Sequence, residues 1–199
     1  GHLAVFHDAD DAQEDAQDAV GENAYTLTVA NDVSAIIPAL DMSNPKCIVV
    51  KEITGALQQW NDDTDQTQVQ VFDRLAQVNG EACTSTVLRH MMDNASVDQL
   101  TFVVRRPTER VVVLPKSDRL GLDISFRKQV SIRPWVTGIR GGAMGQWNFE
   151  KPSLQIDVHD RILSVNGVSG GPLELVDKLQ RVQDNLLITF LHYGDEVNP

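Results

Sequence analysis

The sequence predicts a mainly β protein with α elements, built from two copies of one small module. Val71–Gly80 and Val158–Gly167 share one pattern, an Asp-Arg pair, an apolar run and an Asn-Gly pair, 87 residues apart. Short apolar runs bounded by turn residues are typical of strands, and Asn-Gly favours a tight hairpin turn. The offset persists upstream, because twelve of the twenty-six positions from Gly55 to Gly80 are identical in the second copy. Self-similarity at a fixed offset indicates a repeated structural unit.

The elements of the first copy follow from its apolar runs. Tyr25–Val29 alternates between apolar and polar residues, as a half-buried strand does. Ala35–Ile37 and Cys47–Val50 are the next apolar runs and are expected to continue the sheet. Thr86–Met92 has helical spacing, and Leu100–Val104 is expected to be the closing strand.

The second copy repeats this order. The expected strands are Arg110–Leu114, Leu122–Phe126, Trp135–Ile139, Arg161–Val165 and Leu186–Leu191, with a helix before the last strand. The segment between the copies, residues 105–109, contains Pro107 and is too short to let the modules move freely. We therefore expect the two modules to pack as one rigid tandem.

Charge and composition divide the chain further. We expect four parts: an acidic tail over residues 1–22, the first module over 23–107, the second module over 108–194 and a short tail over 195–199. The first tail holds seven acidic residues and no Lys or Arg, with a weak apolar stripe that predicts either a short helix or a solvated segment. The net charge is −11, which argues against nucleic-acid binding. The apolar runs are too short to span a membrane, so no membrane-spanning segment is expected.

The second copy resembles a PDZ domain. Asp160–Gly167 is similar to the centre of that family's fold, and Arg119-Leu120-Gly121-Leu122 resembles its carboxylate-binding loop. Downstream, Pro172–Gln180 resembles the family's second helix. The resemblance extends over most of residues 108–193, and the first copy shares it through the repeat. It implies two PDZ-like modules, each a partly open antiparallel barrel of five or six strands capped by two helices.

The resemblance also implies a peptide-binding site in the second module, where a partner's C-terminus adds as a strand between the second strand and the second helix. Glycine lets the backbone of this loop turn so that successive N–H groups converge on a carboxylate. The expected site residues are the cations Lys116 and Arg119, the loop and strand residues Leu120, Gly121, Leu122, Asp123 and Ile124, and the helix residues Pro172, Leu173, Val176 and Leu179.

The helix start predicts the partner class. Where many members of the family have a His that selects Ser or Thr, this sequence has Pro172 or Leu173, according to the alignment. Neither side chain forms hydrogen bonds, so an apolar residue is expected there in the partner. The partner's last residue is also expected to be apolar, and Asp123 is expected to favour a basic residue nearby.

The first copy departs from the pattern, because its loop reads Asp32-Val33-Ser34-Ala35. Ser34 replaces the glycine, and the negative charge of Asp32 repels a carboxylate. We therefore expect the first copy to bind no C-terminus, and to pack against the second copy or present a surface to other subunits together with the acidic tail.

The remaining motifs predict structure rather than catalysis. Gly138, Gly141, Gly142 and Gly145 are expected to form a turn into a short helix, and Trp60 and Trp147 to anchor such helices in the core. Cys47 and Cys83 are expected to be buried thiols, which favours a reducing cytoplasmic or organellar compartment. The five histidines show no metal-ligand spacing, and no nucleophile elbow is present. No enzyme activity, metal or cofactor is predicted.

Two functional hypotheses remain. The first is a non-enzymatic adaptor or scaffold whose second module binds the C-terminus, or an internal peptide, of a partner. The second is a structural accessory subunit of a larger assembly, which could be organellar. In that case the grooves either bind other subunits or bind nothing. An open groove beside Ile124 favours the first hypothesis, and an occupied groove favours the second.

Overall fold

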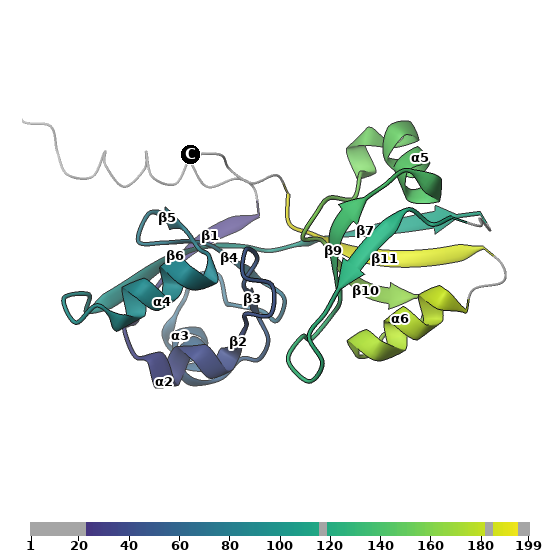
Figure 1. Cartoon of the computed structure of the whole chain (residues 1–199). Helices are drawn as coiled ribbons and strands as arrows, with labels where there is room; N and C mark the ends of the chain where they lie inside the picture. The colour runs from purple at the N-terminus through teal and green to yellow at the C-terminus, as the bar shows by residue number, and fades with distance from the viewer. Residues whose placement is uncertain (1–22, 116–118, 182–184, 195–199) are drawn as a thin grey trace, which may run out of the picture.

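The structure is a computed structural model that describes residues 23–115, 119–181 and 185–194. The expected helix or tail over residues 1–22 lies outside this part. The first copy forms an antiparallel sheet of order β1-β6-β4-β3-β2, with β5 paired to β4 (Figure 1). Its elements are β1 (Ala24–Ala30), α2 (Val33–Ile36), η1 (Ile37–Ala39), β2 (Leu40–Asp41), β3 (Val49–Val50), α3 (Gly55–Asp63), β4 (Arg74–Val78), β5 (Glu81–Ala82), α4 (Ser85–Asp93) and β6 (Gln99–Arg105).

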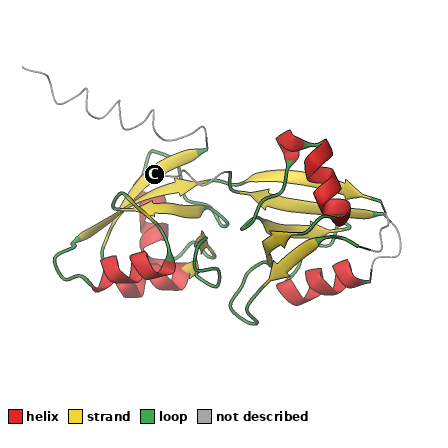
Figure 2. Cartoon of the chain, turned by 45° about the horizontal axis from the view of Figure 1, so that its top comes forward, coloured by secondary structure: helices red, strands yellow, loops and turns green. Residues whose placement is uncertain are grey.

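The second copy forms an antiparallel sheet of order β7-β11-β10-β9-β8, with its helices on either side of the strands (Figure 2). None of the helices described in either copy exceeds nine residues, so none is long enough to cross a bilayer. The elements are β7 (Thr108–Leu114), β8 (Leu122–Ser125), β9 (Trp135–Ile139), α5 (Gly142–Glu150), η2 (Pro152–Leu154), β10 (Arg161–Val165), α6 (Pro172–Gln180) and β11 (Leu186–His192).

The two copies repeat each other closely. The elements α5, β10, α6 and β11 begin and end 87 residues after α3, β4, α4 and β6. The strands β4 and β10 are both bulged, between Leu75 and Gln77 and between Ile162 and Ser164. The predicted fold class, mainly β with two PDZ-like modules of five or six strands, is therefore confirmed.

The repeated Trp-Asn pair is structural in both copies. The Asn61 side chain donates to the carbonyl of Val69 at 2.9 Å and accepts its N–H at 2.7 Å. Asn148 makes the same two bonds to Ile156, at 2.8 and 2.9 Å. Trp60 and Trp147 pack against the two cores, as expected. Each pair therefore fastens its helix to the chain that leads into the central strand.

One expected strand is replaced by a helix. Ala35–Ile37, predicted to continue the first sheet, lies in α2 and η1. The reason is the side chain of Asp32, which caps α2 by accepting the N–H of Ser34 at 2.9 Å and that of Ala35 at 3.3 Å. An Asp at this position is among the strongest helix N-caps, and the cap satisfies N–H groups that a strand would have paired differently.

The two modules pack directly against each other. The linker is reduced to Arg106 and Pro107, because β6 ends at Arg105 and β7 begins at Thr108. A third small core forms at the contact from two buried residues of each module, with Phe72, Ile132 and Leu163 beside them; the buried four are Cys47, Val49, Leu191 and Tyr193. The contact therefore excludes water from apolar side chains of both copies.

A buried ion pair crosses this contact. The Nη1 of Arg161 lies 2.7 Å from Oδ2 of Asp41, and both side chains are 0% exposed. The Asp41 carboxylate also accepts the N–H of Ile132 at 3.0 Å and the hydroxyl of Ser43 at 2.5 Å. Such a pair is costly in a core unless further hydrogen bonds support it. Here the Asp41 carboxylate accepts these two bonds, whereas the buried Nε of Arg161 has no hydrogen-bond partner among the described residues.

The ionisation of Asp41 is expected to make the contact between the two modules sensitive to acid. Burial alone would raise its pKa, but the charge of Arg161 and the hydrogen bonds from Ser43 and Ile132 outweigh this and hold the pKa below the ordinary 3.8. Because the pKa is lower in the folded state, the carboxylate stabilises the fold above about pH 4 and stops doing so as the pH falls through the folded pKa. We expect the unmutated protein to melt higher than Asp41→Asn at pH 7, and this gap to narrow below pH 4. Thermal unfolding of both proteins from pH 7 to pH 3 measures the gap, and a constant gap would contradict the assignment.

Candidate binding groove

The second sheet ends in a free edge at β8. No described strand pairs with the outer side of β8. On the inner side, the N–H of Arg140 donates to the carbonyl of Gly121 at 2.8 Å, so Leu122 and Ile139 face each other as a pair without mutual hydrogen bonds. The N–H and carbonyl of Leu122 therefore point away from β9. An unpaired edge of this kind can accept an added strand.

The loop before β8 turns three N–H groups to one side. The carbonyls of Arg119, Leu120 and Gly121 accept hydrogen bonds from Ala143, Met144 and Arg140, at 3.1, 3.0 and 2.8 Å. In a trans peptide the N–H of the next residue points opposite to the carbonyl. The N–H groups of Leu120, Gly121 and Leu122 therefore all point away from α5 and β9, as an anion-binding nest requires.

Glycine makes this loop possible. Gly121 has a φ of +73°, in the left-handed region that other residues rarely adopt. A Cβ on Gly121 would lie 1.7 Å from the carbonyl oxygen of Gly141. The loop and the start of α5 thus approach each other more closely than any side chain permits. Of the four glycines predicted to form a turn into a short helix, Gly141 and Gly142 lie at the start of α5, whereas Gly138 lies in β9 and Gly145 inside α5.

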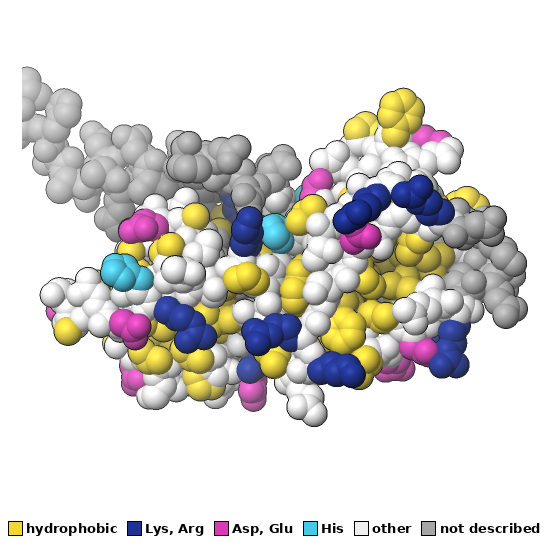
Figure 3. Space-filling view, viewed as in Figure 1, with side chains coloured by type: hydrophobic (Ala, Val, Ile, Leu, Met, Phe, Trp, Pro, Cys, Tyr) yellow, Lys and Arg dark blue, Asp and Glu magenta, His cyan; other side chains and the backbone are white. Residues whose placement is uncertain are grey.

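Apolar side chains from the loop, β8 and α6 come together beside the free edge. Leu120, Leu122, Ile124 and Leu179 are half-buried and pack against the second core. Val176 is also half-buried on α6. Figure 3 shows hydrophobic side chains gathered between β8 and α6 on the open face of the molecule. The structure therefore brings together the predicted loop, strand and helix residues.

The far end of this apolar surface is a pocket of about 270 Å³, where the end of β8 meets the start of α6. The predicted residues Pro172 and Leu173 lie here. Five further lining residues were missed by the sequence reasoning: Phe126, Lys128, Gln129, Gly171 and Glu174. Phe126 could have been found, because a period of two places it on the same face as Leu122 and Ile124. Lys128 and Gln129 belong to a loop whose course the sequence does not indicate.

The charged residues near the loop form contacts within the module. A guanidinium N–H of Arg119 donates to the carbonyl of Arg140 at 3.0 Å. The carboxylate of Asp123 forms an ion pair with Arg140, whose side chain is largely solvent-exposed, while that of Asp123 is partly exposed. Arg140 thus takes the place in which the sequence led us to expect a basic residue of a partner. Lys116, the other expected cation, lies outside the described residues.

The first copy has a different surface at the matching place. The sheet edge there is β2, whose two residues Leu40 and Asp41 are both buried. The loop N–H groups of Ser34 and Ala35 are bonded to the carboxylate of Asp32. Hydrogen bonds from Ser34 lower the pKa of Asp32, so the carboxylate stays charged at neutral pH. An internal carboxylate therefore occupies donors that a partner's carboxylate would need.

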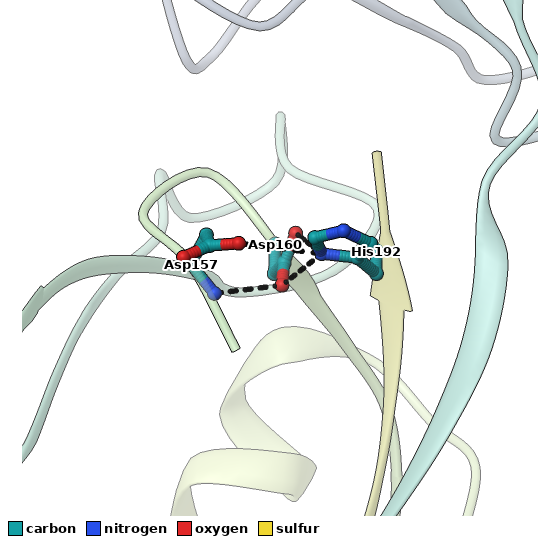
Figure 4. Close-up of side chains that lie close together, drawn as sticks. All are labelled: Asp157, Asp160 and His192. Carbon is teal, nitrogen blue, oxygen red and sulfur yellow. Dashed lines mark hydrogen bonds and ion pairs between the residues drawn. The ribbon is translucent and has the colours of Figure 1, made fainter. Parts of the chain in front are cut away.

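Asp160, the acid of the second Asp-Arg pair, has a structural role. Asp160 accepts the N–H of Asp157 at 2.9 Å and that of Tyr193 at 3.3 Å, and its carboxylate lies 2.9 Å from Nδ1 of His192 (Figure 4). Asp157, Asp160 and His192 are close enough to share an ion. The oxygens of Asp160, however, are already used to fasten the turn before β10 to the end of β11. His159 has a φ of +81° in this turn, which a residue other than glycine rarely adopts.

Both cysteines are buried, as expected. Burial raises the pKa of the Cys83 thiol to about 12, so this thiol stays protonated at neutral pH. A protonated, inaccessible thiol is a poor nucleophile. The cysteines thus serve the cores in which they lie, Cys83 in the first module and Cys47 at the contact between modules.

Comparison with known proteins finds similar solved structures, two of which share 15% and 12% identity with this chain. No family model matches the sequence, and no curated protein matches it. Among solved structures, a complex of INAD PDZ45 with NORPA CC-PBM is similar over 90% of this chain and 97% of that chain, at 15% identity and a TM-score of 0.39. INAD PDZ45 in complex with an NG2 peptide covers 88% and 92%, at 12% identity and a TM-score of 0.38. These scores are too low to support an argument, so the fold rests on the strand order and the repeat.

Proposed function

We propose that the protein is a non-enzymatic interaction protein whose second module binds the free C-terminus of a partner by strand addition. The observation that carries this proposal is the common direction of the N–H groups of Leu120, Gly121 and Leu122, beside an unpaired strand edge. A terminal carboxylate accepts such N–H groups through charge-assisted hydrogen bonds, which are about twice as strong as neutral ones. The main chain of the peptide then pairs with β8.

The apolar surface gives the partner its expected chemistry. Leu120, Leu122 and Leu179 offer only carbon atoms to the last side chain of the peptide, so an apolar last residue fits best. Pro172 and Leu173 at the far end favour an apolar residue upstream as well. No described segment of the chain pairs with the edge of β8. This supports capture of a partner over an assembly subunit whose groove is already occupied.

The first module serves a different purpose in this proposal. The loop N–H group of Ser34 already donates a hydrogen bond to the carboxylate of Asp32. The sheet edge of this module, β2, is buried at the contact with the second module. The first module supports the second module and offers a surface to other subunits, and it binds no C-terminus itself.

The proposal is tested with the full chain and a labelled synthetic peptide that ends in Val with a free carboxylate. We expect the C-terminally amidated form of this peptide to bind at least tenfold more weakly, a loss of about 1.4 kcal/mol, because the amide cannot replace the charge in the nest. Fluorescence anisotropy titration measures both affinities. Equal binding of the two forms would mean that no carboxylate is recognised and would remove the proposal.

A matched pair of variants locates the groove. Leu179→Glu places a charge in the apolar surface beside β8, and it is expected to weaken binding of the free-carboxylate peptide at least tenfold. Leu187→Glu makes the same chemical change on β11 at a side chain that is 41% exposed, and it should leave binding unchanged. If Leu187→Glu were the harmful variant, the peptide would bind elsewhere.

A further inference from the structure

The far pocket of the groove belongs to the second module, but the loop that forms one side of it is held by the first. This loop runs from Phe126 at the end of β8 to Ile132 before β9. Phe126, Lys128 and Gln129 line the pocket from the loop, and the start of α6 lines it from the opposite side. The shape of the pocket therefore depends on what fixes the loop.

The first support of the loop is internal. The N–H groups of Val130 and Ser131 donate to the carbonyl of Arg127, at 3.2 and 2.9 Å. The N–H of Arg127 in turn donates to the hydroxyl of Ser131 at 2.7 Å. The turn between them includes Gln129 at a φ of +62°, which a residue other than glycine rarely adopts. A strained turn of this kind keeps its shape only when its surroundings hold it.

Those surroundings lie in the first module. The hydroxyl of Ser131 donates to that of Ser43 at 2.8 Å, and Ser43 donates to Asp41. The other oxygen of Asp41 accepts the N–H of Ile132 at 3.0 Å, at the end of the loop. Ser43, Asp41 and Ser131 are all buried, so these bonds are not exchanged with water.

We propose that Ser43 and Asp41 of the first module set the shape of the far pocket in the second module, and thereby select the partner residue that the pocket receives. The inference rests on the proposed function of the groove. According to this inference, the first module positions the loop that recognises the peptide, although the first module itself contacts no peptide. The buried bonds hold Ser131 and Ile132 at one end of the loop, and the Ser131 hydroxyl in turn holds Arg127 near the other end. Loss of these bonds therefore lets the loop leave the pocket.

The position of the selected residue follows from strand geometry. The peptide's C-terminus lies at the start of β8, so the peptide runs antiparallel to this strand. Leu122 and Phe126 are four residues apart, or about 13 Å along a strand. The pocket therefore receives the side chain about four residues before the last one. Its lining is mainly apolar, with Lys128 and Glu174 of opposite charge, so a large uncharged side chain such as Phe fits it best.

The test uses the full chain and two synthetic peptides with the same four last residues, ending in Val with a free carboxylate. One peptide has Phe at the preceding position and the other has Ala. We expect the unmutated protein to bind the Phe peptide at least fivefold more tightly. Ser43→Ala, which removes the partner of Ser131, should reduce this preference at least threefold while leaving the affinity for the Ala peptide unchanged. Phe126→Ala, which removes the pocket side chain itself, should do the same.

The chain offers a matched control at the same contact between modules. The side chain of Asn44 bonds to the ring of His159 across the contact at 3.1 Å and accepts the N–H of Lys46, so these bonds go to neither Ser131 nor Ile132. Asn44→Ala should keep the preference for Phe. If it reduced the preference as much as Ser43→Ala does, general loosening of the contact would be the cause and the inference would be wrong. A preference unchanged by Ser43→Ala also overturns it.

Failure of the proposed function has a different result. If the unmutated protein binds both peptides equally and amidation weakens both, the groove reads a carboxylate but the far pocket is unused. Only the inference on Ser43 and Asp41 is then overturned. If the unmutated protein binds neither peptide, the proposed function fails, and the inference fails with it.

Discussion

Replacing Asp41 by alanine is expected to lower the free energy of unfolding by about 3–5 kcal/mol. The substitution leaves the guanidinium of Arg161, which is fully buried, without its carboxylate. It also removes the acceptor of the Ile132 N–H. Loss of one partner of a buried pair costs more than the pair contributes, because the remaining charge cannot regain its hydration. Denaturant unfolding of the full chain measures the loss.

Two further variants make this result interpretable. Asp62→Ala removes an exposed carboxylate on α3 and should change the free energy of unfolding by less than about 0.5 kcal/mol. The double variant Asp41→Leu with Arg161→Met replaces both charges by apolar groups and should recover much of the stability lost in Asp41→Ala. A loss below about 1 kcal/mol in Asp41→Ala would contradict the buried pair that the structure places between the modules.

Replacing Gly121 by valine is expected to weaken binding of the free-carboxylate peptide at least tenfold, about 1.4 kcal/mol. The sequence alone places Gly121 at a strand edge outside the core, where the fold would tolerate this change. The structure corrects that expectation, because a Cβ there would lie 1.7 Å from the carbonyl oxygen of Gly141. The variant should therefore also lose about 1–3 kcal/mol of stability or more, since the backbone must shift.

Glycine elsewhere in α5 provides the control for stability. A Cβ on Gly145 meets nothing within 4 Å, so Gly145→Ala should leave stability unchanged or raise it by about 0.5–1 kcal/mol. Binding should persist in this variant. Ser34→Val in the first copy should leave binding unchanged, since its loop donors are bonded to Asp32. If Ser34→Val weakened peptide binding and Gly121→Val did not, the binding groove would have to be assigned to the first copy.

The sequence by itself determined the repeat and most of the elements in it. The strand Trp135–Ile139 and the helix Pro172–Gln180 lie where they were predicted, because their signals are local. Period-two alternation, a Pro at the first helical position and Asn-Gly turns act over a few residues. The loop residues Leu120, Gly121 and Leu122 were predicted from their resemblance to a known loop motif, in which the glycine permits the turn. Their role in binding stays a prediction.

Only the tertiary structure decided how the two copies differ and how they contact each other. The repeat led us to expect a strand over Ala35–Ile37, and the cap formed by Asp32 makes it helical instead. The pairing of Asp41 with Arg161 joins residues 120 positions apart, and Ser43 meets Ser131 across 88 positions. No local pattern encodes such contacts, because they depend on how two folded modules meet. The shape of the far pocket and its support by the first module depend on this contact between the modules. Single residues of the groove could therefore be predicted from the sequence, whereas the residues that shape its far pocket could not.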